Sequence, residues 1–113
     1  MGLVSVIKNG ISAMLAREPL PENAVLLDVR NHKEFAKGIV ENSICIPVGE
    51  LQAKQTELVQ QCKLDTPIVV YCASGGRAVR AKKLLIKMGY KQVVNGGGIY
   101  HVAKKLSKPI VSC

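Results

Sequence analysis

Two short runs of aliphatic residues constrain the fold of this chain most strongly. AVLLDV spans residues 24–29, and PIVVYC spans residues 67–72. Both runs are nearly continuous in apolar side chains, which is typical of strands that are buried on both faces. Such strands occur in parallel sheets covered by helices on both sides, so the two runs predict an α/β fold.

The segments around these runs predict helices and two further strands. Spacing and composition predict helices over 4–15, 31–36, 50–62, 77–89 and 99–106, and strands over 44–46 and 92–94. We expect Asn31 to cap its helix at the amino end, Gly89 to end another, and residues 96–98 to form a turn. Strands that alternate with helices indicate a mainly parallel sheet with right-handed crossovers.

Length and charge narrow the class of protein and of partner. The 113 residues fit a single domain over 1–113, and the composition, 48% hydrophobic and 21% charged, is ordinary for a soluble globular protein. The net charge is +8, but the basic residues are scattered and no aromatic side chains are interleaved with them. Nucleic-acid binding is therefore not expected, and the charge favours a small anion or an acidic protein as partner.

The cysteines and the amino-terminal segment indicate the cellular setting. Four cysteines stand at 45, 62, 72 and 113, without a CxxC pair and with only two histidines in the chain, so no metal site is expected. A domain of this size does not need disulfides, which favours a reducing compartment. The first 15 residues are too polar for a signal peptide, and no apolar run approaches the roughly 18 residues that span a membrane. We expect a cytoplasmic protein with no membrane association.

The most informative segment is CASGGR, which follows the second apolar run and precedes a predicted helix. In open α/β sheets, ligands bind beyond the carboxyl ends of strands, where DVR, CASGGR and NGGG all fall. The glycines let several backbone N–H groups converge, and the helix start and an arginine add positive charge. Such a cradle would stabilise a thiolate or an oxyanion. The candidate nucleophile is Cys72, and the candidate anion-binding residues are Ala73, Ser74, Gly75, Gly76 and Arg77. An inert cysteine at the end of a core strand is the alternative.

The string VVYCASGGRA resembles the active-site segment of rhodanese-family domains, C-x-S-G-x-R-[SA]. LLDVRNHKEFAKG, ICIP and LLIKMGYKQVVNGGGIYHV resemble further family segments in the same order, so the likeness covers about residues 25–104. The resemblance implies a three-layer domain with a mainly parallel sheet of four to five strands. It also implies a sulfurtransferase without metal or dissociable cofactor. Cys72 would take sulfur from a donor such as thiosulfate, hold it as a persulfide, and pass it to cyanide, a small thiol or a protein.

Loop length separates this activity from related ones. Cys72 to Arg77 is C-x4-R, as in the sulfurtransferases that the chain resembles, whereas related phosphatases and arsenate reductases use C-x5-R. A small-anion phosphatase or arsenate reductase is therefore the less favoured reading. A persulfide carrier that docks on a partner protein is a second alternative. Two departures from the family pattern leave the substrate open: residues 38–43 lack its usual histidine, and Tyr100 stands where tryptophan is common.

Three charged residues near the first apolar run could line the site: Asp28, Arg30 and Glu34. We favour structural support as their role, with Arg30 pairing with Glu34 or capping a loop. The other histidines and cysteines are expected at surface or packing positions, with Cys113 open to oxidants: His32, His101, Cys45, Cys62 and Cys113.

Overall fold

The computed structural model describes residues 19–113, and its centre is a parallel β-sheet. The sheet consists of β1 (Val25–Asp28), β3 (Ile44–Cys45), β4 (Ile68–Cys72) and β5 (Val93–Gly98). The strands lie in the order β3-β1-β4-β5, and every neighbouring pair is parallel. The α/β fold with a mainly parallel sheet is therefore confirmed.

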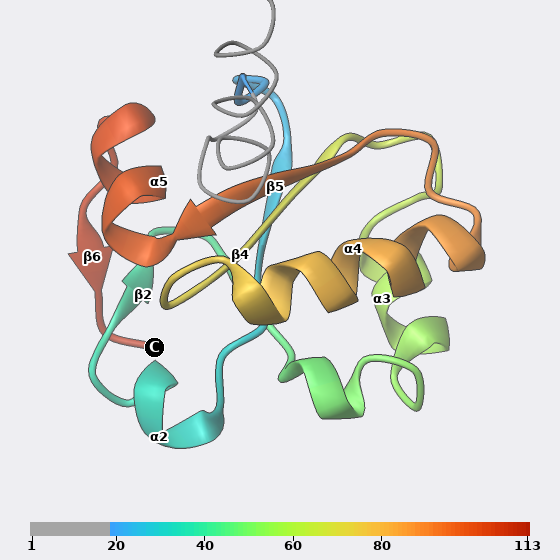
Figure 1. Ribbon diagram of the computed structural model, residues 1–113, viewed down its shortest axis with the longest axis horizontal. Helices are drawn as coiled ribbons and strands as arrows, with labels where there is room; N and C mark the ends of the chain where they lie inside the picture. The colour runs from blue at the N-terminus through green and yellow to red at the C-terminus, as the bar shows by residue number, and fades with distance from the viewer. Residues whose placement is uncertain (1–18) are drawn as a thin grey trace, which may run out of the picture.

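Helices cover both faces of this sheet (Figure 1). On one face, the side chains of Val70 and Cys72 join a core completed by α3 (Gln55–Gln61) and α4 (Gly76–Met88). On the other face, Val69 and Tyr71 pack in a second core with α5 (Ile99–Lys105). Successive residues of β4 thus enter opposite cores, which explains why this strand is apolar along its whole length. The arrangement is the expected three-layer domain.

The helix ends agree with the predicted capping residues. Asn31 caps α2 (His32–Phe35): its side chain accepts a hydrogen bond from Glu34 N at 2.9 Å, and its own N–H donates to Glu34 Oε1 at 3.1 Å. This reciprocal pair is a capping box. Gly89 ends α4 with a left-handed φ of 108°, which glycine adopts without steric cost.

The helix predicted over 50–62 is wrong in its first half. Val48–Glu50 forms a 3₁₀ helix, and α3 begins only at Gln55. Hydrogen bonds that span three residues, such as Leu51 N to Val48 O, wind the connecting backbone more tightly than an α-helix.

The turn predicted over residues 96–98 is also wrong, because β5 continues through Gly98. A register shift opposite Val70 and Tyr71 and a positive φ of 83° at Gly97 let the glycine run stay paired with β4. A Cβ at Gly96 would lie 2.7 Å from the Val102 side chain and 2.8 Å from that of Val69. Glycine there allows α5 to pack closely on the sheet.

A second, two-stranded sheet was not predicted. It pairs β2 (Ile39–Val40) with β6 (Ile110–Val111) in antiparallel register, and Glu41 N donates to Pro109 O beside it at 3.0 Å. These strands are two residues long, too short to leave a periodic pattern in the sequence. The helix predicted over 4–15 lies outside the described residues. Among residues 19–113, no helix has the length and apolar character needed to cross a membrane.

Candidate active site

Cys72 is the last residue of β4, and its thiol lies at the start of α4. The residue is only 1% exposed, and its Sγ accepts a hydrogen bond from the Gly75 N–H at 2.9 Å. Gly75 is the amino-terminal cap of α4, with a left-handed φ of 105° that side-chain-bearing residues rarely adopt. This conformation turns the N–H back toward the sulfur, so the predicted contact between loop backbone and thiol is present for Gly75.

The outer part of the loop faces solvent. Ala73, Ser74 and Gly76 are exposed, whereas Gly75 is buried against the rest of the protein. The outer residues of the loop are therefore in contact with solvent, whereas Cys72 is almost fully buried beneath them. A contact between the Ser74 hydroxyl and a bound anion stays a prediction.

Strand β5 supports the loop from below, a role that sequence reasoning missed. Asn95 Nδ2 donates to Gly75 O at 3.3 Å, and its Oδ1 accepts from Gly97 N at 2.8 Å. Gly98 passes so close to the loop that a Cβ built on it would collide with the Ala73 carbonyl. The available signal was the sequence NGGG directly after a strand, which marks a close approach of two backbones.

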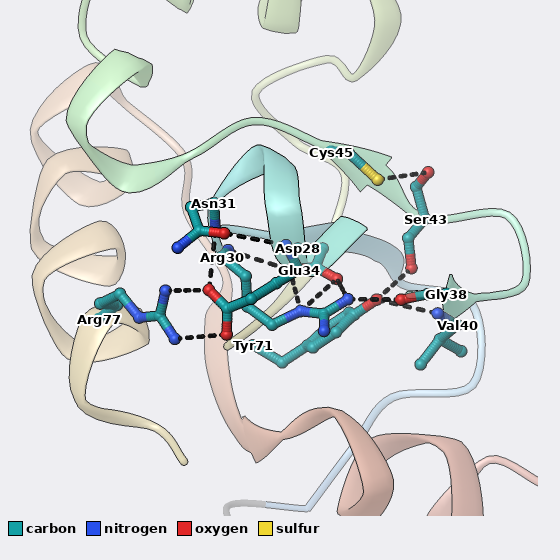
Figure 2. A network of polar contacts seen from close by, with 10 residues as sticks. All are labelled: Asp28, Arg30, Asn31, Glu34, Gly38, Val40, Ser43, Cys45, Tyr71 and Arg77. Carbon is teal, nitrogen blue, oxygen red and sulfur yellow. Dashed lines mark hydrogen bonds and ion pairs between the residues drawn. The ribbon is translucent and has the colours of Figure 1, made fainter. Parts of the chain in front are cut away.

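Arg77, the predicted anion-binding residue, is paired with Glu34 (Figure 2). Arg77 Nη1 donates to Glu34 Oε1 at 2.5 Å, and Nη2 donates to Oε2 at 3.0 Å. The hydrogen bond from Arg77 lowers the pKa of Glu34 from 4.5 to about 2, and the same bond raises the pKa of Arg77. A negative charge on the Cys72 sulfur would also raise the pKa of Arg77. The expected pairing of Arg30 with Glu34 is wrong, because Glu34 faces Arg77.

Arg30 instead binds Asp28 in the interior. Its Nη2 lies 2.8 Å from Asp28 Oδ2, and its Nε lies 3.0 Å from both carboxylate oxygens. Nη2 also donates to Gly38 O at 2.6 Å. Asp28 is fully buried and Arg30 is 6% exposed, so this pair braces the end of β1 against the segment before β2. Arg30 thus pairs with Asp28 and binds the Gly38 carbonyl, and its supporting role stays a prediction.

Tyr71 extends this support and was not singled out from the sequence. Its hydroxyl accepts a hydrogen bond from Val40 N at 3.1 Å and lies 2.7 Å from Ser43 Oγ. The side chain is fully buried, and burial raises the pKa of its phenol. Tyr71 therefore ties β4, just before Cys72, to β2. No sequence pattern distinguishes such a tyrosine from an ordinary core residue.

Within residues 19–113, no group of three or more His, Cys, Asp or Glu side chains is arranged to hold a metal ion. Cys62 is buried in the main core, as expected for a packing residue. His32 is exposed and lies 2.8 Å from Glu50.

Comparison with known proteins gives a consistent result. The Rhodanese-like domain family matches this chain over residues 5–104. The thiosulfate sulfurtransferase PspE of Escherichia coli is 33% identical over 87% of this chain and 94% of its own length. A putative mitochondrial thiosulfate sulfurtransferase of Schizosaccharomyces pombe is 33% identical over 74% of this chain, which spans 66% of that protein.

Other relatives and a solved structure complete the comparison. Relatives also include tRNA uridine(34) hydroxylases such as that of Cronobacter sakazakii, of which this chain spans only 25%. The solved structure of an E. coli rhodanese with anions superposes with a TM-score of 0.67 at 29% identity, over 80% of this chain and 99% of that one. The fold, the site segment and the family match agree, and the chain belongs to the rhodanese-like domain family.

Proposed function

We propose that this protein is a sulfurtransferase that carries sulfane sulfur on Cys72. The observation that carries the proposal is the 2.9 Å hydrogen bond from the Gly75 N–H to Cys72 Sγ at the first turn of α4. A helix start and an inward N–H favour negative charge on the sulfur, and a persulfide carries such a charge. The thiosulfate sulfurtransferase PspE, which this chain covers over 94% of its length, supports the same class of reaction by its name.

The reaction proceeds in two displacements. The Cys72 thiolate attacks the outer sulfur of thiosulfate, the sulfur–sulfur bond of the donor breaks, and sulfite leaves with the electron pair. Cys72 then holds the transferred sulfur as a persulfide anion beside the Gly75 N–H. A thiophile such as cyanide attacks that outer sulfur and regenerates the thiolate, so no redox cofactor is consumed.

Arg77 takes part in binding the anionic donor, and Glu34 competes for it. Both terminal nitrogens of Arg77 are engaged by Glu34 in the structure. A donor anion must therefore share or displace the carboxylate to reach a bidentate contact with the guanidinium. This competition sets the affinity for the donor rather than the sulfur chemistry itself.

Two other functions fit the same loop less well. A small-anion phosphatase or arsenate reductase would need a wider cradle than six residues from Cys72 to Arg77 provide. A persulfide carrier that docks on an acidic protein fits the net charge of +8 and differs in its donor, a partner protein instead of thiosulfate. We expect the activity in a reducing compartment such as the cytoplasm, because a domain of this size does not need disulfides.

Intact mass spectrometry tests the proposal directly. After incubation with thiosulfate, the reduced protein should gain one sulfur atom, and cyanide should remove it with release of thiocyanate. The Cys72→Ala variant should gain nothing, whereas Cys113→Ser, which removes an exposed thiol, should behave as wild type. Failure of the wild type to gain sulfur would exclude thiosulfate as donor. Gain of sulfur from a protein persulfide alone would then establish the carrier function.

A further inference from the structure

Two cysteines far apart in the sequence lie together at the edge of the sheet. Cys45 in β3 and Cys113 beyond β6 line one cavity of about 450 Å³, together with residues of β2 and α3. Strand β3 is one of the two edge strands of the main sheet. The cavity is therefore at the surface, where a small molecule can enter it.

The small second sheet brings the two cysteines to this place. Val111 pairs with Ile39 and Ile110 pairs with Val40, so β6 leads the chain back beside the segment that precedes β3. Cys113 follows β6 by two residues. In Figure 1 the carboxyl end of the chain, marked C, lies near β2, in agreement with the pairing of β2 and β6.

The two thiols interact but differ in environment. Cys45 is half-buried, and its Sγ lies 3.9 Å from Ser43 O (Figure 2). The pKa of Cys45 is raised to about 12. Burial is the larger cause, and the neighbouring Cys113 thiol is the second. Cys113 is exposed. A reagent from solution therefore meets Cys113 first, with the protonated Cys45 thiol beside it.

The Cys45 side chain lies on the opposite face of the sheet from Cys72. Asp28 is in register with Cys45 on one side and with Tyr71 on the other, and residues in register on parallel strands share a face. Tyr71 belongs to the core beneath α5, whereas Cys72 belongs to the core beneath α4. Cys45 therefore does not belong to the core that surrounds the Cys72 thiol.

We propose that Cys45 and Cys113 form a reversible intramolecular disulfide when the protein meets a low-molecular-weight disulfide. The Cys113 thiolate attacks the reagent, whose sulfur–sulfur bond breaks, and one thiol leaves while a mixed disulfide forms. Cys45 then loses its proton and attacks the Cys113 sulfur, which releases the second thiol. Two protein thiols are oxidised and one reagent disulfide is reduced. The product links the edge strand β3 to the residues that follow β6.

Mass spectrometry with oxidised glutathione tests this assignment in a Cys72→Ala background, which removes the thiol of the candidate active site. The expected product has lost two hydrogen atoms and carries no glutathione, and a reductant restores the original mass. Adding Cys45→Ser should stop the reaction at a glutathione adduct on Cys113, and adding Cys113→Ser should abolish the hydrogen loss. Cys62→Ala, which removes a core thiol, is the matched control and should leave it unchanged.

Three results would overturn the proposal: a stable glutathione adduct on the background protein, hydrogen loss that persists without Cys113, or a covalent dimer in its place. Urea unfolding gives a second readout. The oxidised protein should unfold at a higher urea concentration than the reduced protein, because the link constrains the unfolded chain. If the disulfide forms but the urea midpoint does not change, the disulfide does not stabilise the attachment of the residues after β6 to the sheet.

Discussion

Arg77 at the start of α4 and Glu34 in α2 form a bidentate ion pair, although 43 positions separate them in the chain. The arginine expected to bind the donor anion thus already has an anionic partner. A donor anion that binds this guanidinium would have to exchange with the Glu34 carboxylate. We therefore predict that Glu34 tunes donor binding.

Removal of the Glu34 charge should strengthen donor binding. In Glu34→Gln the amide can still cap α2, since glutamine serves in a capping box, but it holds Arg77 less tightly. Partly exposed pairs of this kind contribute up to about 1 kcal/mol, so the KM for thiosulfate should fall about two- to fivefold with little change in kcat. Steady-state kinetics of thiocyanate formation measures both constants.

Glu22→Gln is the control, because it removes the same charge from an exposed position on another segment. It should leave the KM unchanged. A rise in KM on Glu34→Gln would mean that Glu34 positions Arg77 for the donor instead of competing with it.

The same ion pair predicts how stability changes in acid. The pKa of Glu34 is lowered from 4.5 to about 2, so its contribution to folding is complete above the unfolded value and is lost as the pH falls toward 2. The difference in urea stability between wild type and Glu34→Gln should therefore stay constant above about pH 5 and shrink below about pH 4. Urea unfolding followed by circular dichroism across this range measures it. A difference that does not change with pH would contradict the assignment of the lowered pKa to this pair.

The sequence was sufficient to predict the sheet and the loop but not the partners of the charged residues. AVLLDV and PIVVYC are nearly continuous in apolar residues because both faces of their strands are buried, and this pattern can be seen without a structure. CASGGR carries its chemistry in consecutive residues, so its position at a strand end was also predictable. Which carboxylate meets which arginine depends on how α2 packs near α4, and nothing in the local sequence records that packing.

The buried pair of Arg30 and Asp28 should contribute strongly to stability and little to sulfur transfer. Arg30→Ala leaves the fully buried Asp28 carboxylate without its partner and frees the Gly38 carbonyl. Loss of one partner of a buried pair costs about 3–5 kcal/mol of unfolding free energy, which urea denaturation measures. Arg80→Ala, at an exposed position of α4, is the control and should change stability by less than about 0.5 kcal/mol. A stable Arg30→Ala protein that no longer gains sulfur would place Arg30 in the reaction instead.

The close passage of β5 beneath the loop predicts a sensitive glycine. In Gly98→Ala the new methyl group would collide with the Ala73 carbonyl, a backbone atom that cannot swing aside. The loop must then shift away from β5 and carry the Gly75 N–H with it. We expect a loss of about 1–3 kcal/mol in unfolding free energy from overpacking, and a decrease of at least about tenfold in kcat/KM from the displaced loop.

Gly49→Ala is the control, because it adds the same methyl group at a position away from the loop. A Cβ at Gly49 would meet nothing within 4 Å, so that variant should keep wild-type kinetics and stability within about 0.5 kcal/mol. Urea unfolding and the rate of sulfur gain from thiosulfate, measured on both variants, decide the question. If Gly98→Ala gains sulfur as fast as Gly49→Ala, the contact between β5 and the loop does not position the Gly75 N–H, and the hydrogen bond to Cys72 must be maintained by the helix alone.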